Sequence, residues 1–492
     1  MKFGGSSLAG VKEILQSIGI VKQYAENSDV VVVCSAMGDT TDHLVQAVET
    51  AKTGKVDEAR KLIDEVRTKH EYAISETIRN DYYREDAVEF VADRYEEINR
   101  ALLGISLLND VSPRSLDYVL SFGEQLSTMI INNAILSTGK LRSKYLTGGN
   151  AGIVTDRNFG AAAPMLKLTG ENLNKNLLPL LEEGTIPIVA GYIAEAHETF
   201  EITTLGRGGS DYTASLIAAA IGADEVLLWT DVDGILTADP KIVKDARIVE
   251  RITYFEAMEM SAFGAKAMQP QALEPVAKKG ISVRIKNTFR PQIEGTLIGP
   301  ESGTANGTKA GVKSVGAMTG IAIVNIGGTS IVGSPGTAIK IFEILKELKV
   351  GILMISQSVS ENNVSLTIRK DPLPKVIKAF RTELLHEDPE GIEKGSNGAF
   401  PNSKFSKVEY EDDVSVIAVL GRGMSGTPGI AGRVFTTVAR QGINIRMIAQ
   451  GSSEINISFV IKDKDRARAV IALHEEFGLG QKIVEKAAQI SQ

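Results

Sequence analysis

The chain has 492 residues, of which 43% are apolar, a net charge of −7 and one cysteine, and this length predicts two to four domains. The negative charge and the scattered basic residues exclude the usual nucleic-acid footprint, and no apolar stretch reaches the roughly 18 residues of a membrane span. The single cysteine, Cys34, excludes a disulfide framework, favours a reducing compartment such as the cytoplasm, and is expected to be a buried, inert thiol.

The first residues have the pattern of a short strand, a glycine turn and a helix. Lys2 is followed by Gly4, Gly5 and Ser6, and apolar residues then recur at helical spacing over 8–24. Such a turn can hold a phosphate group, although the chain contains no Walker A loop. The strand is so short that a few further residues are expected upstream.

Three buried strands are predicted to deliver polar loops to one edge of a parallel sheet. The apolar runs 29–35, 186–192 and 225–229 end at Ser35, Gly191 and Trp229. Ligands of open α/β sheets bind at the carboxyl ends of the strands. The loop after Ser35 contains Thr40 and Thr41, which serve either as helix caps or as donors to a ligand carboxylate.

Helices are predicted between these strands. Amphipathic patterns over 52–108 predict two or three helices, with His70 on their exposed side. The apolar segment 116–136 predicts another helix, and it contains Glu124. A buried carboxylate needs a partner, which is either the ammonium group of a substrate or an arginine in a structural salt bridge.

The stretch 203–222 has the strongest functional signal. Glycines surround Arg207, Ser210 and Asp211 are predicted to cap a helix, and Gly222 is predicted to end it. Glycine amides, a helix N-terminus and an arginine together suit a carboxylate or phosphate group. The structural alternative is a tight turn before a well-capped helix.

Acidic residues follow the third strand. Asp231, Asp233 and Asp239 are candidates to surround a nucleotide and its Mg²⁺. A helix is predicted over 255–268, and its Lys266 is placed to reach a phosphate. Glycines and prolines then mark a domain boundary near residue 300.

The last third of the chain contains a repeat. Residues 334–369 align with 427–462 without a gap, which indicates two copies of one module. Each copy has a β-α-β-β-α pattern, a ferredoxin-like plan. Pro335 and Pro428 are expected at the first helical position of each copy, and exposed sheet edges favour pairing of the modules or of two chains.

Six ordered motifs together resemble the aspartate kinases. They are KFGGSS at 2–7, SAMGDTTD at 35–42, SFGEQLST at 121–128, TTLGRGGSDYTA at 203–214, WTDVDGILTADP at 229–240 and FGAKAMQP at 263–270. The resemblance implies an α/β amino-acid-kinase domain at 1–300, with a mainly parallel sheet. It also implies two ferredoxin-like ACT modules at 319–386 and 408–480, the second completed by a strand at 312–318. The implied activity is ATP-dependent phosphorylation of the L-aspartate side chain, the first step of lysine, threonine and methionine biosynthesis.

The resemblance also assigns roles to individual positions. Lys2 is similar to the lysine that steadies the transferring phosphoryl group, and Asp211 to the residue that orients the reaction centre. Glu124 would hold the substrate ammonium and Arg207 its carboxylate. The other positions on the aspartate side are Thr41, Tyr192 and Ser210, and those on the ATP side are Gly4, Gly5, Ser6, Thr230, Asp231, Leu236, Asp239, Lys241, Lys266 and Ala267.

The resemblance also implies a Mg²⁺ ion bound mainly through phosphates, with no dedicated metal ligands, and feedback by an amino acid. Leu353 occupies a position that is acidic in some lysine-inhibited relatives, which favours threonine over lysine as the effector. A homo-oligomer, at least a dimer, is expected through the ACT modules, with no nucleic acid or membrane as partner. The candidate effector residues are Ser334, Gly336, Thr337, Ala338, Ile352, Gln357 and Asn363.

Two alternatives remain open at this stage. The chain could phosphorylate another acid, as glutamate and acetylglutamate kinases do, although the tandem ACT-like modules argue against this. It could instead be an amino-acid sensor that kept the kinase fold without catalysis, although intact Lys2, Arg207, Asp211 and Lys266 argue against that reading.

Overall fold

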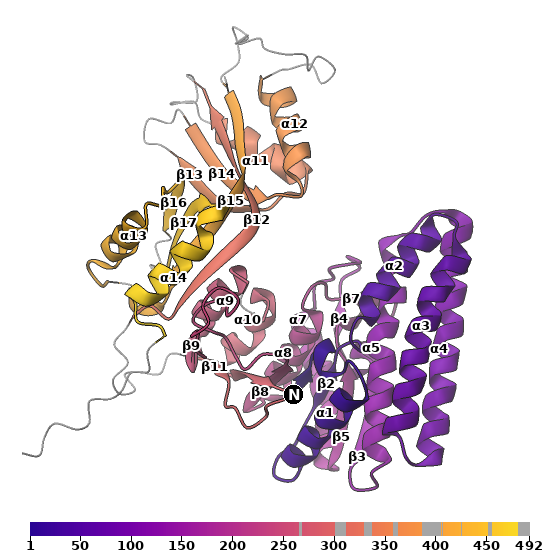
Figure 1. The fold of residues 1–492 in the computed structure, drawn as a ribbon. Helices are drawn as coiled ribbons and strands as arrows, with labels where there is room; N and C mark the ends of the chain where they lie inside the picture. The colour runs from indigo at the N-terminus through magenta and orange to yellow at the C-terminus, as the bar shows by residue number, and fades with distance from the viewer. Residues whose placement is uncertain are drawn as a thin grey trace, which may run out of the picture. The chain divides into compact units, whose positions relative to one another are not determined.

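A computed structural model describes residues 1–264, 268–300, 311–328, 337–357, 363–385, 405, 407–424, 426–450 and 455–480 (Figure 1). The chain forms two compact units. The first consists of Met1–Ile235, Ile248–Ser261 and Lys266–Gly303, and the second of Leu236–Arg247, Ala262–Ala265 and Thr304–Gln492. No helix among the described residues has both the length and the apolar character needed to cross a membrane.

The first unit is built on an eight-stranded sheet in the order β3-β5-β2-β1-β8-β10-β11-β9. The neighbours from β3 to β10 are parallel, and β11 runs antiparallel to β10. The three buried strands predicted from the sequence therefore share one sheet and one direction. The bounds are β1 Lys2–Phe3, β2 Val32–Cys34, β3 Arg142–Leu146, β5 Thr185–Ala190, β8 Glu225–Thr230, β9 Arg251–Thr253, β10 Ser282–Asn287 and β11 Thr296–Gly299.

A smaller sheet and eleven helical segments complete the described part of this unit. The small sheet contains β4 (Val154–Thr155), β6 (Ile193–Ala196) and β7 (Ile202–Thr204). The helical segments are η1 Gly5–Ser7, α1 Val11–Ala25, α2 Thr40–Lys52, α3 Val56–Thr77, α4 Asp81–Leu108, α5 Pro113–Leu136, α6 Gly148–Ala151, α7 Leu166–Glu182, α8 Gly209–Ile221, α9 Tyr254–Ala262 and α10 Pro270–Lys279.

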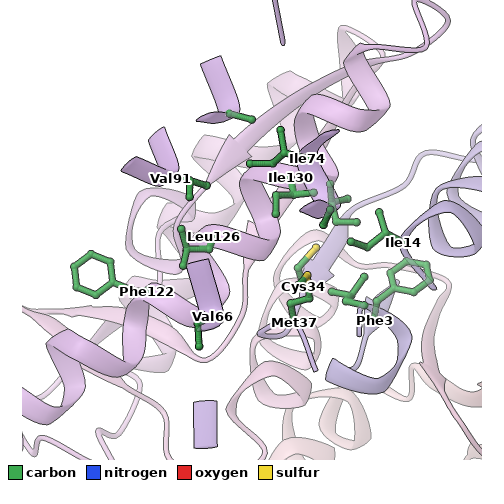
Figure 2. Close-up of a cluster of buried hydrophobic side chains, with 14 of the residues drawn as sticks. Phe3, Ile14, Cys34, Met37, Val66, Ile74, Val91, Phe122, Leu126 and Ile130 are labelled. Atoms are coloured by element: carbon green, nitrogen blue, oxygen red, sulfur yellow. The ribbon is translucent and has the colours of Figure 1, made fainter. Parts of the chain in front are cut away.

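The core of the first unit lies between the sheet and helices α1 to α5 (Figure 2). Phe3 and Cys34 contribute from the strands, and Phe122 and Leu126 from α5. Helix α5 is buried along most of its length because α2, α3 and α4 pack around it, and these helices run side by side in Figure 1. The expectation of a buried Cys34 is confirmed, and burial raises the pKa of its thiol to about 12.

Two predictions about helices in this unit are wrong. His70 is buried rather than exposed, because it falls on the apolar stripe of α3 that includes Val66 and Ile74. Its Nδ1 atom lies 2.8 Å from the Val66 carbonyl oxygen. The helix expected over 255–268 ends at Ala262, and α10 begins separately at Pro270.

The second unit contains a six-stranded antiparallel sheet in the order β13-β14-β12-β15-β17-β16. Chain order confirms the β-α-β-β-α repeat. The first copy comprises β12 Ser314–Gly327, α11 Thr337–Glu347, β13 Ile352–Gln357, β14 Asn363–Arg369 and α12 Leu373–Leu385. The second copy comprises β15 Lys407–Leu420, α13 Ile430–Arg440, β16 Met447–Gln450, β17 Asn456–Lys462 and α14 Arg466–Glu476.

The helix start in the second copy differs from the expected one. Helix α13 begins at Ile430, and its N-cap is Gly429 in the left-handed region at φ 91°. Pro428 therefore precedes the helix instead of opening it, because the left-handed Gly429 turns the chain between them. The corresponding Ser334 and Pro335 lie outside the described residues.

A segment from the middle of the chain is part of the second unit. Within Leu236–Arg247, Ala238 and Val243 join a core cluster with Phe459 of β17. The Thr237 hydroxyl lies 2.9 Å from Nε2 of His474 on α14. The Arg247 guanidinium donates to the Leu479 carbonyl oxygen at 3.0 Å. The residues that follow β8 are thereby packed into the ferredoxin-like unit.

Candidate active site

A cavity of about 400 Å³ opens in the first unit where β1, β2 and β5 end. It brings together residues that are far apart in the sequence but were singled out by the motifs. Side chains of both charges line it, so it suits a small zwitterionic acid. The lining residues are Lys2, Ser35, Thr41, Glu124, Gly160, Tyr192, Gly206, Arg207, Gly208, Gly209, Ser210 and Asp211.

Lys2 and Asp211 form an ion pair in this cavity. The Lys2 Nζ atom lies 2.7 Å from Asp211 Oδ1, and both side chains are largely buried. Lys2 belongs to β1 and Asp211 to the first turn of α8. The pair therefore joins the central strand of the sheet to the start of the helix that follows the glycine-rich loop.

The glycine-rich loop approaches the cavity as backbone. Gly206 and Gly208 have φ values of 71° and 75°, which glycine adopts without steric cost. Gly208 is the N-cap of α8 and no side chain caps this helix, so the predicted capping role of Ser210 or Asp211 is wrong. Both side chains face the cavity instead. The predicted stop at Gly222 is confirmed by its φ of 67°.

Arg207 lies at the tip of this loop and is exposed. Within the described ranges it takes part in no ion pair with an acidic side chain. A guanidinium held by a glycine loop beside a cavity is suited to a bidentate contact with a carboxylate. The exposed position of Arg207 therefore leaves its guanidinium N–H groups available to a ligand.

Glu124 is buried against the cavity and has an unusual environment. Burial raises its pKa to about 8, while a hydrogen bond from Ala36 and the charge of Lys2 act in the opposite direction. Its Oε2 atom has no hydrogen-bond partner among the described residues. Gly123 makes this position possible, because a Cβ there would lie 2.9 Å from Ala36 Cβ. A buried carboxylate with a free oxygen is a binding group for a cation.

Tyr192 is held in a strained conformation beside the cavity. Its φ of 67° is unusual for a residue with a side chain. The Tyr192 amide donates to the Thr213 hydroxyl at 3.1 Å, which helps to hold this conformation. Gly191 permits the close approach of α8, because a Cβ there would lie 2.8 Å from Ser210 Cβ. Strain of this kind is concentrated at functional sites.

The opening glycine turn packs against the loop that follows β2. A Cβ on Gly5 would lie 3.1 Å from the carbonyl oxygens of both Ala36 and Gly38. The Gly4 amide donates to the Trp229 carbonyl oxygen at 3.1 Å, and Ser6 is exposed in η1. Thr41, in the first turn of α2, lines the cavity, whereas the Thr40 hydroxyl donates to the Met37 carbonyl oxygen.

The residues expected on the nucleotide side fall in different parts of the structure. Thr230 and Asp231 belong to the first unit, where the Thr230 hydroxyl donates to Asp231 at 3.1 Å. Leu236, Asp239 and Lys241 belong to the second unit. Lys266 and Ala267 lie outside the described residues.

The carboxylate of Asp233 already has side-chain partners. It pairs with Arg290 at 2.5 Å and accepts from Asn287 at 2.7 Å. Within the described residues, no group of three or more His, Cys, Asp or Glu side chains is arranged to hold a metal ion.

Part of the expected effector site can be located. Ile352 and Gln357 bound β13, Asn363 begins β14, and Thr337 and Ala338 open α11. The side chains of Gln357 and Asn363 are exposed, and Leu353 is 37% exposed. Ser334 and Gly336 lie outside the described residues.

Gly160 is a cavity residue that the motifs did not reveal. It lies in a loop between β4 and α7, and the buried Asp117 of α5 accepts a hydrogen bond from its amide. Only the turn-forming composition of 156–164 marks this loop in the sequence, and composition alone does not show where the loop packs.

Family models match most of the chain. The model of the amino acid kinase family matches residues 1–287, and a model of the ACT domain matches residues 324–384 and 417–477. Aspartokinase 1, chloroplastic, of Arabidopsis thaliana is 32% identical over 485 residues, which cover 97% of this chain and 79% of that protein.

Solved structures of aspartokinases share the fold. E. coli aspartokinase III in complex with aspartate and ADP has a TM-score of 0.77 and 26% identity, covering 97% of this chain and 99% of that one. The same enzyme in complex with lysine and aspartate has a TM-score of 0.76 and 28% identity, covering 97% of this chain and 98% of that one.

Proposed function

This chain belongs to the aspartokinases of the amino acid kinase family, and from that premise we propose that it converts ATP and L-aspartate to ADP and 4-phospho-L-aspartate. An oxygen of the aspartate side chain bonds to the γ-phosphorus, and the bond from this phosphorus to the β,γ-bridging oxygen breaks. The observation that carries the proposal is the cavity that collects Lys2, Asp211, Glu124 and Arg207.

The substrate is held by complementary charges. Glu124, buried with one oxygen lacking a described partner, receives the ammonium group of aspartate. Arg207, exposed at the loop tip, receives the α-carboxylate in a bidentate contact. Thr41, Tyr192 and Ser210 line the same cavity and orient the reacting side chain.

The transfer step needs positioning and charge neutralisation more than proton transfer. The attacking carboxylate is already a nucleophile, so no general base is required. Lys2, steadied by Asp211 at 2.7 Å, neutralises charge on the transferring group, and Gly4, Gly5 and Ser6 border its path. Bound Mg²⁺ would supply further neutralisation through phosphate oxygens, which suits a site where Asp233 is already paired with Arg290.

The nucleotide is assigned to Thr230 and Asp231, with Leu236, Asp239, Lys241, Lys266 and Ala267. The catalytic domain is assigned to residues 1–300 and the ACT modules to 319–386 and 408–480. The second module is completed by the strand at 312–318, an assignment supported by Val315, which belongs to the same core cluster as Phe459.

The ACT modules are proposed to bind a feedback amino acid and to join chains into a homo-oligomer. Threonine is preferred to lysine, because Leu353 offers no negative charge to a lysine ammonium. The enzyme would then open lysine, threonine and methionine biosynthesis. The cytoplasm is the proposed compartment, which accords with a single buried cysteine.

The test is the trapping of the acyl phosphate by hydroxylamine with Mg-ATP and a panel of acids. Aspartate should give a hydroxamate and ADP, whereas glutamate and N-acetylglutamate should not. Product from another acid alone would overturn the substrate assignment. Thermal stabilisation by aspartate without ADP release would favour the sensor alternative.

Regulation is tested in the same assay by titrating threonine, lysine and methionine separately. Threonine is expected to inhibit at lower concentration than lysine. Inhibition by lysine alone would contradict the argument from Leu353, and it would leave the catalytic proposal intact.

A further inference from the structure

Asp117 is a buried carboxylate that lies outside every motif and does not line the cavity. It belongs to α5, two turns before Glu124, and its side chain is 1% exposed. Three donors converge on it. Its Oδ2 atom accepts from the Gly160 amide at 2.9 Å and from the Thr204 amide at 3.1 Å, and its Oδ1 atom accepts from the Thr204 hydroxyl at 2.7 Å.

The donors belong to the two segments of backbone that enclose one end of the cavity. Gly160 is itself a lining residue. Thr204 ends β7 and is separated by a single residue from the glycine loop that presents Arg207. The two segments also contact each other, since the Ala162 amide donates to the Thr204 carbonyl oxygen at 2.9 Å.

Close packing leaves the glycine loop little freedom here. A Cβ on Gly206 would lie 3.4 Å from the Gly160 carbonyl oxygen. One carboxylate is therefore hydrogen-bonded both to Gly160 and to the strand that leads to Arg207.

We propose that Asp117 is a positioning residue of the aspartate site, which sets the Gly160 loop and the base of the Arg207 loop at the spacing that the substrate α-carboxylate requires. This inference rests on the proposed function, because it assigns the α-carboxylate to Arg207. Asp117 touches no substrate atom and acts only through backbone that it holds. It sets the affinity for aspartate and has no direct effect on the nucleotide.

A purely structural role for Asp117 would change stability without changing the affinity for aspartate. The loop that contains Gly160 has a second attachment. Its Arg157 pairs with Glu201 at 2.8 Å, and Glu201 also pairs with Arg114 of α5 at 3.0 Å. These ion pairs remain when Asp117 is changed, so the loop keeps its attachment while its inner edge loses a fixed spacing. Burial raises the pKa of Asp117 and the three hydrogen bonds partly offset this, as expected for a carboxylate fixed by donors.

The test compares four variants of the full chain. Asp117→Ala removes all three hydrogen bonds. Asp117→Asn keeps an acceptor oxygen for the two amides, and its amide group can donate to the Thr204 hydroxyl, so it tests geometry without charge. Thr204→Val removes only the hydrogen bond from the Thr204 hydroxyl to Asp117. Asp86→Ala is the matched control, because Asp86 accepts from Asn133 of the same α5 at 2.7 Å and lies outside the cavity.

Asp117→Ala should raise the aspartate KM roughly ten- to a hundredfold, the size of effect expected from a misplaced binding group, and leave the ATP KM nearly unchanged. Thr204→Val should give a smaller rise, and Asp117→Asn should restore most of the affinity. Asp86→Ala should match the wild type in both constants. Thermal melting of each variant, with and without aspartate, separates affinity from stability.

An unchanged aspartate KM in a folded Asp117→Ala protein would overturn the inference. The inference would also be overturned if the KM values for aspartate and ATP rose together. The same holds if the aspartate KM of Asp117→Asn were as high as that of Asp117→Ala. Should Asp117→Ala fail to fold, Thr204→Val and Asp117→Asn still decide the matter. If the wild type itself formed no acyl phosphate, the proposed function would fail instead, so the two failures are distinct.

Discussion

Arg207 is the side chain whose role is easiest to isolate, because it is exposed and the described residues offer it no acidic partner. Arg207→Ala should raise the aspartate KM by roughly two orders of magnitude, since a charge-assisted bidentate contact is lost. The melting temperature should change little. Steady-state kinetics with varied aspartate, together with a melting curve, checks this prediction.

Two further variants sharpen that measurement. Arg207→Lys keeps the charge without the fork and should be intermediate. Arg60→Ala removes a surface arginine paired with Asp57 on α3 and should behave as the wild type. If Arg207→Ala bound aspartate normally, the α-carboxylate would have to be assigned elsewhere.

Glu124 predicts a pH dependence of substrate binding. Burial raises its pKa to about 8 in the free enzyme, and the ammonium group of aspartate requires its ionised form. The kcat/KM for aspartate should therefore rise with pH and level off above about 8. Glu124→Gln should raise the KM and remove this dependence, whereas Glu195→Gln, at a half-buried carboxylate outside the cavity, should retain it.

The same group affects stability with a defined sign. Between the ordinary value of 4.5 and about 8, the folded chain binds a proton at Glu124 that the unfolded chain has released. The contribution of Glu124 to the free energy of unfolding should fall as pH rises, by about 1 kcal/mol per pH unit. Denaturant titrations of the wild type and Glu124→Gln should differ in this slope. Parallel curves would mean that Glu124 is ionised throughout.

At the scale of the element, α8 has a glycine at each end, and glycine is needed for a different physical reason at each. Gly209→Ala would place a Cβ 2.7 Å from the Tyr192 ring and should raise the aspartate KM about tenfold by displacing it. Gly222→Ala meets no atom within 4 Å but forces an alanine to a φ of 67°. It should lower stability by about 1 kcal/mol without changing either KM. Equal kinetics for the two variants would contradict this assignment.

At the scale of the whole molecule, the segment 236–247 belongs to the ACT-containing unit and includes three positions that are proposed to bind the nucleotide. Val243→Ala opens a cavity in the core of that unit, and it should lower the free energy of unfolding by roughly 2 kcal/mol. It should also raise the ATP KM, because the proposed nucleotide residues Leu236, Asp239 and Lys241 belong to the same segment. Melting curves and kinetics with varied ATP provide the measurement.

Val438→Ala is the control for this prediction. Val438 belongs to the same buried cluster but comes from α13, so its loss should lower stability to a similar extent and leave the ATP KM unchanged. If the two variants altered the ATP KM equally, the segment 236–247 would have no special connection to the nucleotide.

Much of the fold followed from local pattern in the sequence. Continuous apolar runs predicted β2, β5 and β8, and the gapless repeat predicted the two β-α-β-β-α copies, because these signals lie within one element or one module. The predictions that were wrong concern helix ends and one side chain. Ser210 was expected to cap α8 and Pro428 to open α13, but left-handed glycines cap both helices. His70 was placed on the wrong face of α3.

The sequence by itself singled out Lys2, Glu124, Arg207 and Asp211, since these residues lie in motifs whose order and spacing are visible along the chain, and all four line one cavity. Only the tertiary structure decided that Asp117 holds Gly160 and Thr204, and that the segment 236–247 packs with α14. Both are contacts between residues distant in sequence, and their energy comes from burial and hydrogen-bond geometry that arise only when the elements pack together.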